Sequence, residues 1–192
     1  MRDPDSVAFM ITRAVAVLAV LAGSIVVLTG CSASIDDIVD RSLERSVEDA
    51  QDSFWPYRDK IASDPESTLA DLDFVADFRS GESEGASILL LGVADSSDGP
   101  TLTLLGTGGA QTGGGWWYDQ ADAAVCFALS FPTDEKMILT SRAECPPGAP
   151  VDEYDSVVPL DDLNPRLVVT AADYPPSICQ CYSGSVCDCP GG

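Results

Sequence analysis

Residues 35–54 carry the pattern that most narrows what this chain can fold into. Apolar side chains recur there at every third or fourth position: Ile35, Val39, Leu43, Val47, Ala50 and Phe54. This spacing is typical of one face of an α-helix, and the charged residues in between would form the opposite, solvated face. Pro56 lacks a backbone donor, which predicts the end of the helix or a kink. We expect the stripe to pack on the rest of the domain; the alternative is a helix that binds a partner.

A second, shorter helix is predicted just after the first. Ser63 and Glu66 have the spacing of a capping box, and Pro65 suits the first turn of a helix. Residues 73–79 fit both a helical and a strand-like spacing, so the pattern assigns them to neither.

From residue 86 onward the pattern is that of β-strands. Residues 86–94 and 101–107 are two apolar runs around a cluster of Asp, Ser, Gly and Pro, which predicts a hairpin. Residues 116–118 and 123–131 indicate further strands, and 136–140 are a candidate partner for the latter. Together with the helices, this predicts an α+β fold with a small antiparallel sheet.

Residues 106–115 are rich in glycine and invite comparison with loops that cradle phosphate. The segment lacks the Gly-Lys-Ser/Thr ending of a P-loop, and no helix is predicted after it, so we expect a flexible loop between strands. Trp116, Trp117 and Tyr118 follow directly. Such aromatic residues are expected to fill the core of a small domain; the alternative is a platform on which a sugar ring stacks.

The charge and the lack of histidine restrict the function. The formal net charge is −21, so the surface repels phosphates and nucleic acid is not an expected partner. The chain has no histidine, which excludes a Ser-His-Asp or Cys-His catalytic set and a His-based zinc site. Pairs of carboxylates could serve a glycosidase, but such pairs carry little information among 31 acidic residues.

A continuous apolar run over residues 14–28 stands apart from the rest of the chain. Its length suits the core of a signal peptide, about 7–15 residues, better than a membrane-spanning helix of about twenty. It ends in Leu28-Thr29-Gly30-Cys31, which resembles the lipobox of bacterial lipoproteins. The resemblance implies that diacylglycerol is attached to the sulfur of Cys31 and that the chain is cut after Gly30.

The lipobox resemblance also implies a location at the outer face of the cell membrane. Each buried CH₂ contributes about 0.8 kcal/mol, so two or three acyl chains hold a protein stably. An uncleaved single-span anchor is the alternative. In length and in its Gly-rich, Arg-over-Lys composition, the chain resembles small uncharacterised lipoproteins of high-GC Gram-positive bacteria. Met10, rather than Met1, would begin a regular signal peptide.

A lipid on Cys31 would leave six of the seven cysteines, an even number that suggests disulfide bonds in an exported chain. The candidates are Cys126, Cys145, Cys179, Cys181, Cys187 and Cys189. Proximity in sequence favours the pair Cys126–Cys145. The last four form two Cys-x-Cys motifs that a hairpin would place on one face, as nested disulfides or, alternatively, as a four-thiolate site for zinc or Cu(I).

The predicted organisation is a signal peptide (1–30), a lipidated anchor with a short linker (31–34), an α+β domain (35–145) and a Pro/Asp-rich segment with an irregular, disulfide-stapled tail (146–192). The expected function is a membrane-anchored extracytoplasmic lipoprotein that binds an envelope protein or glycan or supports the envelope, with no catalytic residue, metal or cofactor assigned. The alternatives are a carboxylate-based envelope hydrolase with acids near Trp116 and Trp117, and a soft-metal protein that uses the tail.

Overall fold

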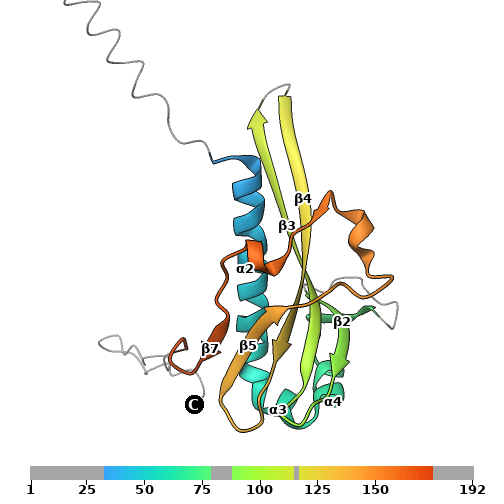
Figure 1. Cartoon of the computed structure of the whole chain (residues 1–192), viewed down its shortest axis with the longest axis vertical. Coiled ribbons are helices and arrows are strands. Elements are labelled where there is room, and N and C mark those ends of the chain that lie inside the picture. Colours follow the sequence, from blue (N-terminus) through green and yellow to red (C-terminus); the bar gives the residue numbers. More distant parts are fainter. Residues whose placement is uncertain (1–32, 79–87, 115–116, 175–192) are drawn as a thin grey trace, which may run out of the picture. The chain divides into compact units, whose positions relative to one another are not determined.

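The computed structural model describes residues 33–78, 88–114 and 117–174. Helices come first along this part of the chain and strands follow (Figure 1). The helical elements are α2 (Ile35–Phe54), the 3₁₀ turn η1 (Trp55–Tyr57), α3 (Arg58–Ser63) and α4 (Pro65–Ala70). Within the described ranges, no helix combines the length and the apolar character needed to cross a membrane.

Helix α2 confirms the prediction made from the apolar stripe. It buries Val39, Leu43, Val47, Ala50 and Phe54 against the sheet. The helix ends at Phe54, two residues before Pro56, and the chain turns into η1. Asp36 and Asp37 lie in the first turn, where negative charge interacts favourably with the helix dipole.

The cap of α4 differs from the predicted capping box. Asp64 is the N-cap residue, and its side chain accepts a hydrogen bond of 3.3 Å from the backbone N–H of Ser67. Ser63 instead ends α3 and donates its hydroxyl to the carbonyl of Lys60. Aspartate and serine are equally good N-cap residues, so residue type alone does not decide between Ser63 and Asp64. The backbone geometry of the turn between α3 and α4 decides it.

The described strands form one seven-stranded sheet in the order β1-β2-β3-β4-β5-β7, with β6 beside β4. They are β1 (Val75–Asp77), β2 (Ile88–Ala94), β3 (Thr101–Gly114), β4 (Trp117–Ser130), β5 (Met137–Arg142), β6 (Ser156–Val157) and β7 (Val168–Thr170). The predicted hairpin is β2–β3, and β5 pairs with β4 as proposed. The sheet is mixed rather than antiparallel, because the short strands β1 and β6 run parallel to β2 and β4.

The glycine-rich segment is part of β3, so the predicted flexible loop is wrong. Its glycines allow α2 to approach the sheet closely. A Cβ atom on Gly108 would lie 2.8 Å from the backbone nitrogen of Leu43, and one on Gly106 would lie 3.1 Å from the Ser46 hydroxyl oxygen. That hydroxyl accepts a hydrogen bond from the backbone of Thr107. Glycine within a strand often marks such a close approach of another backbone.

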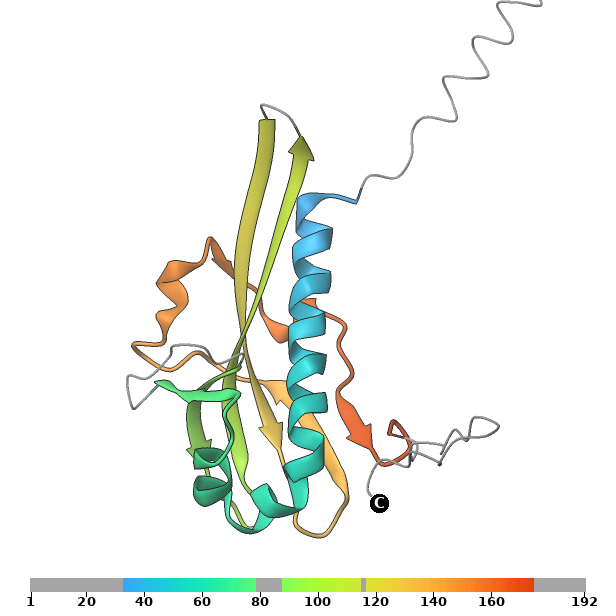
Figure 2. The same ribbon diagram turned by 180° about the vertical axis from the view of Figure 1, so that it is seen from behind.

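Both faces of the sheet are covered (Figure 2). Helix α2 packs on one face, where the larger hydrophobic core lies. On the other face a smaller core contains Leu91, Leu105, Ala124, Cys126 and Ala149. The chain after Cys145 supplies the cover on this side, including the 3₁₀ turn η3 (Pro150–Glu153).

Past Cys145 the chain is more regular than its composition predicted. It adds the 3₁₀ turn η4 (Leu160–Asp162) and the strands β6 and β7 to the domain. Leu160, Leu163 and Val169 belong to the larger core. This part of the chain is therefore packed as far as Tyr174, whose side chain contacts the same core.

Candidate functional site

The end of the β3–β4 hairpin projects past the first turn of α2 (Figures 1 and 2). Trp117 pairs with Gly114, and Tyr118 pairs with Gly113, at the last described positions of the two strands. The two aromatic side chains are 86% and 64% exposed. The prediction that they fill the core is therefore wrong, because the strands run beyond the layer that could cover them.

The cross-strand neighbours of these rings are glycines, so no opposing side chain shields them. Gly113 has a φ of +98°, and a Cβ atom there would lie 2.6 Å from the carbonyl oxygen of Trp117. Only glycine adopts this backbone conformation without strain. We call Trp117, Tyr118 and their partners Gly113 and Gly114 the hairpin tip.

The hairpin tip is also free of charge in a strongly acidic chain. No Asp, Glu, Lys or Arg occurs between Asp98 and Asp119. Exposed aromatic side chains next to an uncharged strand are typical of a contact site, because burial of their apolar rings against a partner is favourable. The hairpin tip is therefore the main candidate for binding.

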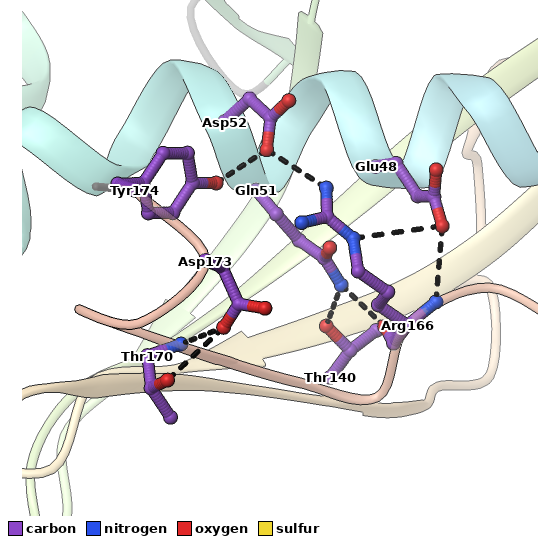
Figure 3. A network of polar contacts seen from close by, with 8 residues as sticks. All are labelled: Glu48, Gln51, Asp52, Thr140, Arg166, Thr170, Asp173 and Tyr174. Carbon is purple, nitrogen blue, oxygen red and sulfur yellow. Dashed lines mark hydrogen bonds and ion pairs between the residues drawn. The ribbon is translucent and has the colours of Figure 1, made fainter. Parts of the chain in front are cut away.

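A polar network fastens the chain after η4 to α2 (Figure 3). Glu44 and Glu48 accept hydrogen bonds from the backbone N–H groups of Asn164 (2.8 Å) and Arg166 (3.3 Å). The two acids are one helical turn apart, about 6 Å along the axis, and two residues of extended chain span about 6.8 Å. The spacing of the two carboxylates along α2 therefore matches the spacing of the two N–H groups along the chain, and each carboxylate accepts from one backbone donor.

Four further side chains complete this network, which we call the clasp (Glu44, Glu48, Gln51, Asp52, Asn164, Arg166 and Tyr174). The Arg166 guanidinium lies 2.9 Å from Asp52 and 3.6 Å from Glu48. The Tyr174 hydroxyl donates to the same Asp52 carboxylate. Tyr174 also stacks on Trp55 at a ring separation of 4.7 Å.

Gln51 is the buried member of the clasp. Its Nε2 atom donates to the Thr140 hydroxyl oxygen and to the Arg166 carbonyl oxygen, both at 2.6 Å. Its Oε1 atom is buried without a hydrogen-bond partner. Gln51 lies on the apolar face of α2 but was not among the residues predicted for that face. Its position four residues after Val47 is the sequence signal that could have identified it as buried.

The clasp changes the acidity of its members. Burial lowers the pKa of Arg166, but its hydrogen bond to Asp52 and the charges of Asp52 and Glu48 raise it above its ordinary value overall. Burial, together with the hydrogen bond to Asp52, raises the pKa of Tyr174. Beside the clasp, hydrogen bonds from the backbone and side chain of Thr170 hold the pKa of Asp173 below its usual range. Tyr174 therefore stays protonated and Arg166 stays charged, the states in which both can interact with the Asp52 carboxylate.

Among the described residues, surface hollows of about 280 to 320 Å³ lie at three other places. One lies beside η1, α3 and α4 and contains Tyr57, Lys60 and Asp71 among its lining residues. The second follows α2 and the β2–β3 edge, and the third lies around Arg142 and Asp161. None of the three is lined by Trp117 or Tyr118, so the hairpin tip is a protrusion and not the wall of one of these hollows.

Cys126 and Cys145 form a disulfide, with their Cα atoms 5.4 Å apart, which confirms the pairing that sequence proximity favoured. Cys126 is buried in β4 within the smaller core. Among the described residues, no three or more side chains of the His, Cys, Asp and Glu types gather as a metal site would require. The lipobox, Trp116 and the tail cysteines Cys179, Cys181, Cys187 and Cys189 lie outside the described residues.

Comparison of the chain with known protein families, with curated proteins and with solved structures found no match.

Proposed function

We propose that this protein is an exported lipoprotein, held by acyl chains on Cys31 at the outer face of a bacterial membrane. The apolar run at residues 14–28 and the lipobox that follows it support this assignment. The observation that carries it is the Cys126–Cys145 disulfide, because it is independent of the leader. Disulfides of this kind persist in oxidising compartments outside the cytosol.

In this proposal the folded domain sits close to the bilayer. Helix α2 begins at Ile35, four residues after Cys31. Four residues span at most about 14 Å when fully extended. The domain is therefore held at the membrane surface rather than displayed on a long tether.

The role that fits this domain best is binding or support of the envelope. The chain has no histidine to act as a general base near neutral pH. Its most conspicuous exposed feature is the aromatic, uncharged hairpin tip. Exposed tryptophan and tyrosine side chains are enriched where proteins contact partners.

The lipid assignment is tested by intact mass measurement of the protein from bacterial membranes, with Cys31→Ser as the matched variant. The expected wild-type mass is that of a chain starting at Cys31 with diacylglycerol attached, and C31S is expected to keep the leader that precedes residue 31 and carry no lipid. Thiol alkylation without reductant should leave Cys126 and Cys145 unmodified. A wild-type protein with an unmodified Cys31, or with free thiols at both of these positions, contradicts the proposal.

A further inference from the structure

We infer that the hairpin tip enters the lipid interface of the same bilayer that holds the anchor. Trp117 and Tyr118 would give the domain a second membrane contact beside the acyl chains. This inference rests on the proposed function, since it requires the domain to be tethered through Cys31.

The hairpin tip and the start of α2 lie at the same end of the domain (Figures 1 and 2). Gly108 meets α2 at Leu43, which gives a common reference point for both elements. From Leu43 back to Ile35 the helix rises about 12 Å. From Gly108 to Gly114 the strand advances about 20 Å in the same direction. The hairpin tip therefore extends about 8 Å farther than the first residue of α2, taking the difference of those two lengths.

This offset matches what the connection to the anchor allows. The four residues from Cys31 to Ile35 reach up to about 14 Å, which exceeds the 8 Å or so by which the tip leads the helix. A lipid-bound Cys31 and the hairpin tip can thus meet one membrane plane. Protein segments that lie at the interface are buried to a depth of about 5–10 Å, which is also the scale of the projection.

The chemistry of the hairpin tip suits a lipid interface. Tryptophan and tyrosine are enriched at the level of the headgroups, because their rings are apolar and their N–H or O–H group stays hydrated. Strand β3 (Thr101–Gly114) has no charged residue, so the partner strand of the hairpin tip would bring no charge into the lipid. The first charge on β4 is Asp119, directly after Tyr118. The acidic remainder of the domain gains nothing from anionic headgroups, so the uncharged tip is the part that can enter.

A glycan is the other ligand that aromatic rings attract, but the geometry favours lipid. Ligand sites for small molecules are concave and contain converging polar groups. The tip instead projects from the sheet, and its cross-strand partners are glycines that offer no side-chain hydrogen bonds. A bilayer needs no pocket, only an exposed amphipathic side chain at the correct height.

The experiment uses the full-length lipidated protein in phosphatidylcholine vesicles. Trp55→Phe and Trp116→Phe leave Trp117 as the single tryptophan. Its fluorescence is compared in vesicles with and without brominated acyl chains, and with iodide in the water phase. We expect a blue-shifted emission that brominated lipid quenches and iodide does not.

The matched control moves the single tryptophan to the other end of α2. Leu167→Trp is made with all three native tryptophans changed to phenylalanine; Leu167 is 55% exposed and follows the Arg166 carbonyl that Gln51 binds. Its emission should respond to iodide and not to brominated lipid. In the wild-type background, Trp117→Ala should reduce the share of emission that brominated lipid quenches, which tests the inference without altering Trp55.

The outcomes separate the two proposals. Lipidated protein whose Trp117 responds to iodide but not to brominated lipid overturns the membrane contact and leaves the anchor intact. The same result, accompanied by an emission shift when envelope glycan is added, replaces the lipid with a sugar ligand. An intact mass without lipid on Cys31 overturns the proposed function and the membrane contact with it.

Discussion

Replacing Gly108 by alanine tests whether close packing of α2 requires the glycines of β3. The new Cβ atom would lie 2.8 Å from the backbone nitrogen and 3.0 Å from the Cγ atom of Leu43, which is itself fully buried. Overpacking of this kind costs about 1–3 kcal/mol. Alanine also restricts the unfolded chain, which stabilises the protein by about 0.4–1 kcal/mol. The free energy of unfolding, measured in urea with the disulfide intact, should therefore fall by up to about 2.6 kcal/mol.

Gly92→Ala is the matched control, because a Cβ atom on Gly92 in β2 would have no atom within 4 Å. The alanine there should raise the free energy of unfolding by about 0.4–1 kcal/mol through the unfolded chain alone. The two variants should thus differ by about 1–3 kcal/mol. Equal urea midpoints for Gly108→Ala and Gly92→Ala would show that α2 does not press on the strand, and would refute this explanation of the glycine-rich segment.

Three further predictions concern the disulfide and the clasp. Replacing Cys126 and Cys145, which are 19 residues apart, by alanine should lower the free energy of unfolding by about 2–4 kcal/mol; an unchanged urea midpoint would contradict this. Gln51→Ala leaves two acceptors without their donor and should cost about 1–3 kcal/mol, whereas Gln111→Ala, at an exposed position, should be neutral. The pKa of Tyr174 is raised in the folded protein, so its contribution to stability is complete below the unfolded pKa of about 10 and is lost as the pH rises through the folded pKa. Alkaline titration at 295 nm should show one late-titrating tyrosine fewer in Tyr174→Phe, and identical titrations would contradict the clasp.

The elements that were predictable from sequence are those whose pattern is local. The stripe in α2, its end before Pro56 and the turn cluster between β2 and β3 each lie within one continuous segment. The disulfide was predictable for a similar reason, because the loop between Cys126 and Cys145 is short and holds the β4–β5 connection.

The features that escaped prediction depend on distant parts of the chain. Glycine has little preference for strands, and β3 forms through Gly106 and Gly108 only because β4 pairs with it and α2 packs on it. Trp117 is of a residue type common in cores, but it is exposed because the β3–β4 hairpin extends past the first turn of α2 (Figure 1). Strands as short as β6 have no room for an alternating pattern, so their partners on β4 decide their place.

The clasp fixes the position of Tyr174, the last residue that the structure describes. The chain enters the domain at Ile35 and passes Tyr174 beside Asp52, near the other end of a helix about 30 Å long. In the proposed arrangement, with a lipid on Cys31 and α2 along the membrane normal, the length of the helix would set the height of Tyr174 above the lipid. That height is several times the Debye length of about 8 Å at physiological ionic strength. In that arrangement Tyr174 and Asp52 would lie in bulk electrolyte, where headgroup charge is screened and lipid composition would not alter the clasp.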